Sequence, residues 1–252
     1  MSDIALFITV VTVTFLLAGL VKGVIGMGLP TLAMGLLSVA MPPAEAAAIL
    51  VVPTVITNIW QMVAGPTLLA LVRRFTLMII GVVVGTFATI GLLTGTTTSI
   101  ATGALGAVLA AYGVHGLVGA RFEVTRESER WFSPIIGLIT GMLSGATGVF
   151  VVPAVPYLNS VRLEKEELIQ SIGISAFVCP LALGLALAVN GQFQATIAGT
   201  SFLALLPALA GMYVGQHLRM RLQPAVFRRW FFYGLIALGG YMVLRSVRHA
   251  YA

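Results

Sequence analysis

The sequence has few of the residues that enzymes and metalloproteins use. It has a single cysteine, Cys179, and three widely separated histidines, His115, His217 and His249. One cysteine excludes an internal disulfide, and these histidines lack the spacing of a metal site. No serine or cysteine stands in a nucleophile motif with an acid–base partner. We therefore expect no enzymatic activity, no bound metal and no cofactor.

Acidic residues are also scarce, and none lies in the middle of an apolar segment. The only aspartate is Asp3, and the glutamates lie at segment ends or in polar connections: Glu45, Glu123, Glu127, Glu129, Glu164, Glu166 and Glu167. Cation transporters and proton pumps place carboxylates inside the membrane, because a carboxylate neutralises the moving charge. Their absence here disfavours a cation site built on side-chain carboxylates.

Apolar residues make up 59% of the 252 residues, whereas only 9% are charged. A bilayer core of about 30 Å requires roughly 20 apolar residues per helix. Eight segments have about this length, namely 4–22, 44–64, 74–94, 97–118, 131–147, 167–189, 196–217 and 226–246. Two others, 29–40 and 149–159, are too short to cross and indicate re-entrant half-helices. The sequence therefore predicts an all-α polytopic membrane protein.

The basic residues indicate how the chain crosses the membrane. They lie at 73–74, within 119–130, at 162–165 and at 219–229, whereas the connections near 41–43, 95–96 and 190–195 contain none. If the basic loops are cytoplasmic, both termini lie outside, and the first segment is retained because it lacks the features of a signal peptide. Arg245 and Arg248 then lie outside, which departs from the positive-inside rule. We interpret the net charge of +6 as an orientation signal and expect no nucleic-acid partner.

A glycine-rich interruption of an apolar segment occurs twice. A shift of 122 residues (141 − 19) superposes Gly19, Gly23 and Gly26 on Gly141, Gly145 and Gly148. A proline follows each copy, Pro30 in the first and Pro153 in the second. Broken apolar helices at matching positions of two halves are the best sequence indication of a transporter binding site. We therefore expect a secondary transporter.

The duplication also predicts the domain organisation. We expect residues 1–118 to form a first transmembrane repeat, 119–130 a cytoplasmic linker and 131–252 a second repeat. Each repeat would be a broken, re-entrant helical hairpin followed by three transmembrane helices. The odd number of crossings inverts the second repeat relative to the first. Transport would then proceed by alternating access around the paired breaks.

The groups near the breaks favour an anion. Lys22 is the only basic residue well inside an apolar segment, and each break begins a half-helix whose amino-terminal N–H groups favour negative charge. Uncharged polar residues lie nearby. The predicted substrate site comprises Lys22, Gly23, Gly26, Gly28, Thr31, Asn58 and Gln61 in the first half, and Ser144, Gly145, Thr147, Gly148, Gln170, Ser171 and Ser175 in the second.

Several of these residues have a simpler interpretation. Gly19 and Gly23 have the spacing of a general helix-packing motif. Lys22 could extend from a helix end to lipid head groups. Asn58 and Gln61 could form hydrogen bonds between helices without contacting a substrate.

Two prolines and a histidine also allow two interpretations. Pro53 and Pro180 lie inside apolar segments and free the carbonyls of Ile49 and Ala176. Their ordinary role is to kink a helix, and exposure of the freed carbonyl to substrate is the alternative. His115 is expected at a helix end, with transfer of a coupled proton as the alternative.

At the glycine-rich segments the chain resembles the sulfite exporter TauE/SafE family, also called the toluenesulfonate uptake permease family. The likeness lies in residues 19–30, 141–149 and 151–158 and extends over nearly the whole chain. It implies a multi-pass protein of a bacterial-type inner membrane that moves sulfite, an organosulfonate or a related anion. One departure is Phe150, which follows the second break where members often carry a run of glycines.

The partners expected from this reading are a small anionic substrate, the lipid bilayer and a coupled proton or ion. A homodimer is compatible with the sequence. The alternative function is a non-transporting membrane module that assembles with other proteins. Such a module would need large loops for partner contacts, and the longest connection here is about a dozen residues. The sequence decides neither which anion is carried nor in which direction.

Overall fold

The computed structural model describes residues 3–95, 98–119, 123–193, 195–221 and 223–251. The prediction of an all-α protein is confirmed for these residues, apart from one isolated bridge between Val124 and Val161. They form the helices α1 (Asp3–Ile25), α2 (Leu29–Ala40), α3 (Pro43–Val63), α4 (Leu68–Arg74), α5 (Thr76–Thr94), α6 (Thr98–Val118), α7 (Arg126–Thr147), α8 (Ala154–Ser160), α9 (Lys165–Val189), α10 (Ala195–Arg219) and α11 (Pro224–Tyr251).

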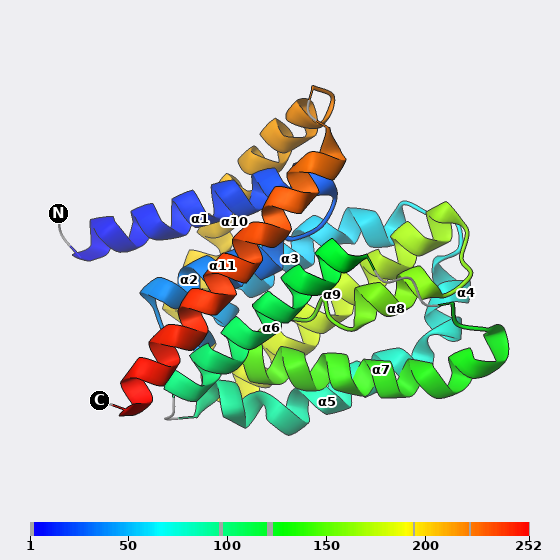
Figure 1. The fold of residues 1–252 in the computed structure, drawn as a ribbon, viewed down its shortest axis with the longest axis horizontal. Coiled ribbons are helices and arrows are strands. Elements are labelled where there is room, and N and C mark those ends of the chain that lie inside the picture. The colour runs from blue at the N-terminus through cyan, green and yellow to red at the C-terminus, as the bar shows by residue number, and fades with distance from the viewer. Residues whose placement is uncertain (1–2, 96–97, 120–122, 194, 222, 252) are drawn as a thin grey trace.

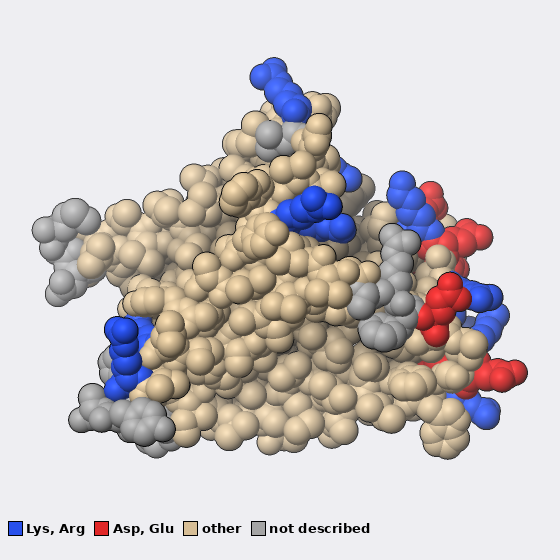
Figure 2. Space-filling view, viewed as in Figure 1, with Lys and Arg blue, Asp and Glu red and all other residues tan. Residues whose placement is uncertain are grey.

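Seven helices of the described chain are long and apolar enough to cross a membrane, namely α1, α3, α5, α6, α9, α10 and α11. The eighth predicted segment, 131–147, lies within α7, whose charged first turns leave a shorter apolar part. Most of the surface in Figure 2 is uncharged, and the acidic side chains gather at one end, beside α4 and the start of α7. Such a surface suits a multi-pass membrane protein.

Some element boundaries differ from the sequence prediction. The short helices α2 and α8 have 12 and 7 residues, and both are too short to cross, as expected. Helix α2 has the predicted bounds, whereas α8 begins only at Ala154 rather than at the predicted residue 149. Helix α4 was not predicted. Helix α7 begins at Arg126, so the last part of the predicted linker 119–130 is helical, and Arg121 lies outside the described residues. In that helical part the Glu129 carboxylate accepts two hydrogen bonds from Arg74, both of 2.7 Å, which tie α7 to α4.

The long helices pack in pairs, and glycines make the closest contacts. Helix α1 lies along α10, α7 along α5, α6 along α11 and α3 along α9 (Figure 1). A Cβ atom at Gly19 would collide with the Ala208 carbonyl oxygen on α10, and one at Gly141 with the Val82 carbonyl oxygen on α5. Small residues allow helix backbones to approach this closely. These two glycines therefore serve helix packing.

The carbonyls freed by Pro53 and Pro180, two of the prolines inside long helices, both have protein donors. The Ser201 hydroxyl donates to the Ile49 carbonyl at 2.7 Å, and the Asn58 amide donates to the Ala176 carbonyl at 3.2 Å. Each bond joins two helices, because Ser201 lies on α10 and Asn58 on α3. The prolines thus create acceptors for neighbouring helices, which is how a broken helical ladder is tolerated inside a membrane protein.

Glycines with left-handed backbone end the first helix of each half. Gly26 and Gly28 have φ of 86° and 102°, and Gly148 has φ of 72°. The Gly26 N–H donates to the Lys22 carbonyl at 2.7 Å, and the Gly148 N–H to the Ser144 carbonyl at 2.8 Å. A side chain would strain this conformation, which glycine adopts without cost from a Cβ. After each turn the chain enters a short helix, α2 or α8.

Candidate functional site

A small cavity lies where the two breaks meet. Its volume is about 30 Å³, which is room for about one water molecule. Both halves contribute to its wall, which consists of Lys22, Gly26, Met27, Gly28, Pro30, Asn58, Gln61, Phe150, Val151, Val155, Ile172, Ser175 and Ala176. The fold therefore brings α1, α2, α3, α8 and α9 to one point.

Lys22 is the charged residue of this cavity. Its side chain is buried, with 6% of the residue exposed. The ammonium group donates to Asn58 Oδ1 at 2.7 Å, to Thr57 Oγ1 at 2.9 Å and to the Thr57 carbonyl at 3.2 Å. These three acceptors are neutral, so they satisfy the N–H groups without balancing the charge.

No carboxylate of the described residues pairs with Lys22. The ion pairs in that part of the chain are Arg74–Glu129 and Arg162–Glu123. Removing an ammonium group from water is costly unless an opposite charge accompanies it. The Lys22 position is therefore one where a bound anion would be strongly favoured.

Asn58 is held so that its oxygen faces Lys22. Its amide nitrogen donates to the Thr54 carbonyl at 2.7 Å and to the Ala176 carbonyl at 3.2 Å. The Ala176 carbonyl is available because Pro180, four residues later, has no N–H to donate to it. A proline of α9 thus orients an amide of α3, which in turn fixes the lysine of α1.

The amino-terminal end of α2 lies beside Lys22. Its cap is Gly28, whose backbone is left-handed and which offers no side-chain cap. The uncompensated N–H groups of a first helical turn give this end a partial positive charge. Thr31, in the same turn, is fully buried, and its hydroxyl has no hydrogen-bond partner among the described residues.

Six of the fourteen predicted site residues line the cavity: Lys22, Gly26, Gly28, Asn58, Gln61 and Ser175. The predicted glycines Gly23 and Gly145 lie instead at helix contacts, against the backbones of α10 and α5. Gly148 forms the second left-handed turn and lies against the Met34 side chain.

The other predicted polar residues also lie away from the cavity wall. Thr147 donates to the Leu143 carbonyl of its own helix at 2.7 Å. Gln170 binds the connection between α3 and α4, since its amide donates to the carbonyls of Met62 and Gly65 at 2.9 and 2.8 Å. The remaining three, Thr31, Ser144 and Ser171, have buried hydroxyls with no partner in the described part of the chain.

The sequence analysis did not select several residues that form the site. Thr57 holds Lys22 as closely as Asn58 does, and its only signal was its place beside Asn58. Met27, Val151, Val155 and Ile172 are apolar wall residues that the sequence does not distinguish from ordinary core residues. Pro30 and Ala176 also line the cavity, and the sequence had marked them only as the proline after the first break and as the carbonyl freed by Pro180. Phe150 lines the cavity, as expected from its position after the second break.

Comparison with known proteins identifies the family. The family model described as "Sulfite exporter TauE/SafE" matches residues 11–242, so the resemblance predicted from the glycine-rich segments is confirmed. The match covers both breaks and every residue of the cavity wall. No curated protein and no solved structure matches the chain.

Proposed function

The chain belongs to the sulfite exporter TauE/SafE family, and we propose that it is a secondary transporter for a small sulfur-containing anion such as sulfite or an organosulfonate. The proposal depends mainly on Lys22, a buried ammonium group with three neutral acceptors and no paired carboxylate among the residues that the structure describes. A charged residue within a membrane segment marks a substrate or ion pathway by default. In this proposal the anion itself is the missing counter-charge.

The neighbouring groups suit the same ligand. The amino-terminal end of α2, which contributes Gly28 and Pro30 to the cavity wall, adds partial positive charge beside Lys22. Asn58 and Thr57 hold the ammonium group at the cavity wall. We assign anion binding to Lys22 and the first turn of α2, with Gln61 and Ser175 at the wall.

The cavity volume of about 30 Å³ is smaller than a sulfite ion with its contacts requires. Binding therefore requires the first and second breaks to move apart. Left-handed glycine turns at Gly26, Gly28 and Gly148 lie between each short helix and its long neighbour, and we propose that they are the hinges of this movement. Opening toward one side at a time would constitute alternating access.

We further propose that the two halves are inverted repeats. The helix pairing supports this, because exchanging the halves converts the α1–α10 pair into the α7–α5 pair and leaves α3–α9 and α6–α11 unchanged. The two glycine turns also have equivalent hydrogen bonds, from Gly26 to Lys22 and from Gly148 to Ser144. A transporter with such repeats holds its substrate near the bilayer midplane, at the repeat interface.

The proposed orientation in an inner membrane places both termini on the outer side and the α6–α7 connection on the cytoplasmic side. It is tested with single cysteines at Glu127, an exposed residue of α7, and at Gln192 in the α9–α10 connection, both in a Cys179→Ser background. An impermeant thiol reagent applied outside should label position 192 and not position 127. Labelling of both positions from the same side would contradict the topology.

The function is tested by measuring uptake of radiolabelled sulfite and of a labelled organosulfonate into proteoliposomes. Lys22→Gln should reduce anion binding about tenfold or more, which is about 1.4 kcal/mol, and Lys22→Arg should be intermediate because the guanidinium is larger and forked. The matched control is Lys165→Gln, which removes the only other lysine, at the exposed start of α9. Equal activity of Lys22→Gln and Lys165→Gln would refute the Lys22 site. Absence of flux for every anion would instead favour a non-transporting module.

A further inference from the structure

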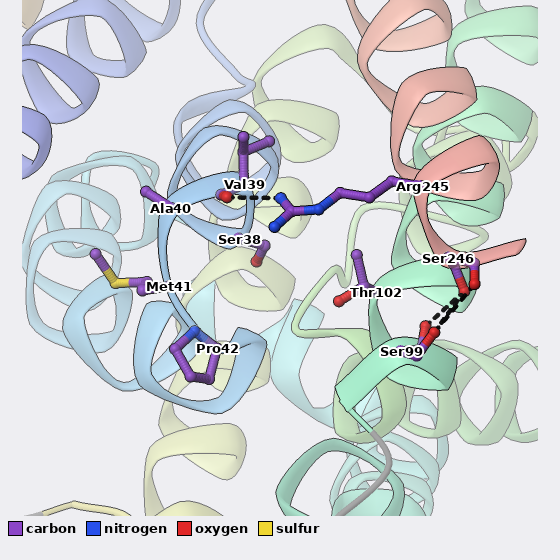
Figure 3. Close-up of a pocket in the computed structure, with 9 residues that line it drawn as sticks. All are labelled: Ser38, Val39, Ala40, Met41, Pro42, Ser99, Thr102, Arg245 and Ser246. Carbon is purple, nitrogen blue, oxygen red and sulfur yellow. Dashed lines mark hydrogen bonds between the residues drawn. The ribbon is translucent and has the colours of Figure 1, made fainter. Parts of the chain in front are cut away.

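A second and larger cavity lies near the carboxyl-terminal end of α11, and it shares no residue with the Lys22 cavity. Its volume is about 300 Å³. The wall consists of the last turn of α2 (38–40), Met41 and Pro42 in the connection to α3, Ser99 and Thr102 of α6, and Arg245 and Ser246 of α11 (Figure 3). No acidic residue belongs to this wall.

Arg245 supplies the positive charge of this cavity. Figure 3 shows its side chain reaching from α11 across to the end of α2, where Nη1 donates to the Val39 carbonyl at 2.8 Å. That bond caps the negative end of α2 and fixes the guanidinium at the wall. A guanidinium carries five N–H donors in a planar fork, so it can hold a helix carbonyl and an oxyanion together.

Hydroxyl groups lie around the guanidinium. The Ser38 residue is buried, with 5% exposed, and its hydroxyl has no hydrogen-bond partner among the described residues. A buried hydroxyl without a partner costs free energy, so a ligand or water in the cavity would account for it. Figure 3 shows Ser38 and Thr102 lying near the arginine side chain.

The corner between α6 and α11 is rigidly held. Ser246 Oγ donates to the Ser99 carbonyl at 2.7 Å, and Ser99 Oγ donates to the Ser246 carbonyl at 3.2 Å. These bonds keep the first turn of α6 beside Arg245. The positive end of the α6 dipole thus adds to the charge of the arginine at the cavity.

The position of Arg245 also needs a functional reason. In the proposed orientation this end of the molecule faces outside, where the positive-inside rule disfavours arginine. A second arginine, Arg248, lies one turn further along α11 and is not part of the cavity wall. An anion site at Arg245 explains a basic residue in a place that the topology does not favour.

We propose that this cavity is a second oxyanion site, which takes an organic anion with a sulfonate or carboxylate head group. The head group binds Arg245, Ser38 and Thr102, and the organic part packs on Met41 and Pro42. A volume of about 300 Å³ is at the lower end of small-molecule sites and exceeds what an inorganic oxyanion fills. Only the placement of the site at the outer face rests on the proposed function.

The test measures binding of 4-toluenesulfonate by calorimetry to the full chain in nanodiscs of zwitterionic lipid. Arg245→Gln should weaken the binding about tenfold or more, because a charge-assisted hydrogen bond to the head group is lost. Arg248→Gln is the matched control, with the same charge change one turn away, and should alter the affinity less than about twofold. Ser38→Ala should weaken binding several-fold, and it keeps the test valid if Arg245→Gln fails to fold.

Other outcomes overturn the proposal in distinct ways. Unchanged affinity in both Arg245→Gln and Ser38→Ala means that the cavity binds no such anion. Equal losses in Arg245→Gln and Arg248→Gln mean that only general surface charge acts. Loss of 4-toluenesulfonate binding in discs with phosphatidylglycerol means that lipid phosphate is the occupant. If Lys22→Gln abolishes all binding of 4-toluenesulfonate, the anion binds at Lys22 alone. That result would overturn the second site and leave the proposed transport function intact.

Discussion

The first break has Lys22 four positions before its left-handed glycine, Gly26. The second break has Ser144 four positions before Gly148. Each turn begins with a left-handed glycine whose N–H donates to the carbonyl four residues earlier, yet the side chains at that earlier position differ in kind. Lys22 reaches three acceptors on α3, whereas the Ser144 hydroxyl is buried without a partner in the described chain. A second ammonium group facing the first would double the cost of burial and add repulsion. Two breaks therefore supply the geometry, and one supplies the charge.

The surroundings of the two breaks differ as well. A Cβ at Gly26 would meet open space, whereas one at Gly148 would lie 2.9 Å from the Met34 sulfur. After the second break comes Phe150, which is buried against Val82 and Cys179. The first break is thus charged and open at Gly26, although a Cβ at Gly28 would lie 2.9 Å from the Phe231 ring. The second break is packed against Met34 at Gly148 and has no charged side chain. We interpret the first as the binding half and the second as the half that shapes the cavity.

The largest effect is expected where the two halves are alike. Gly19→Val and Gly141→Val each place a side chain on the backbone of the partner helix, so both should cost about 3 kcal/mol or more, at the upper end of overpacking. Thermal unfolding and monodispersity in detergent measure the loss. Gly199→Ala on α10 and Gly91→Ala on α5 are the controls, because a Cβ there meets nothing within 4 Å. If only one of the two valine substitutions lowers stability, the α1–α10 and α7–α5 pairs are not equivalent.

The next effect separates the two glycine turns. Gly26→Ala and Gly148→Ala should both destabilise by about 1–2 kcal/mol, because a Cβ disfavours the left-handed region. Gly148→Ala should cost more, since the Met34 side chain must also move. The control is Gly240→Ala, a helical glycine with open space around it. If Gly26→Ala lowers stability more than Gly148→Ala does, Gly26 is not the less crowded of the two glycines.

A smaller effect should appear in substrate choice. Phe150→Leu enlarges the cavity from the side of the second break, so the transport ratio of 4-toluenesulfonate to sulfite should rise about fourfold, which corresponds to about 0.8 kcal/mol for one buried methylene. Phe15→Leu, in the core of α1, is the matched control: it should cost stability on the order of 1 kcal/mol without changing the ratio. An equal ratio in both variants would show that Phe150 does not shape the site.

The smallest effect is expected at Ser144. Ser144→Ala removes a buried hydroxyl that has no partner among the described residues, so stability should stay the same or rise, because no hydrogen bond within the described chain is lost. Sulfite transport should stay within about twofold of the parent, in contrast to Lys22→Gln. Ser175→Ala, which alters a cavity residue, should reduce transport more. A loss in Ser144→Ala as large as that in Lys22→Gln would make the two breaks chemically equivalent after all.

The sequence alone predicted the membrane class, the two short helices and the glycine breaks that precede them, and it singled out Lys22, whose role stays a prediction. Hydropathy, glycine and proline act through local backbone geometry and solvation, so their consequences can be recognised without knowing which helices meet. The family assignment rested on the same local segments. The main error in element boundaries, helix α7 beginning at Arg126, arose because charged residues in a first helical turn resemble a loop.

Only the tertiary structure decided which polar residues meet. Asn58 and Gln170 are similar in the sequence, yet Asn58 contacts Lys22 and Gln170 secures the α3–α4 connection. Gly23 and Gly26 belong to one motif, yet one packs against α10 and the other lines the cavity. Arg245 seemed only to violate a topology rule before the fold placed it beside Ser38. Helix register and partner choice settle such contacts, because a hydrogen bond between helices depends on atoms dozens to hundreds of residues apart in the chain.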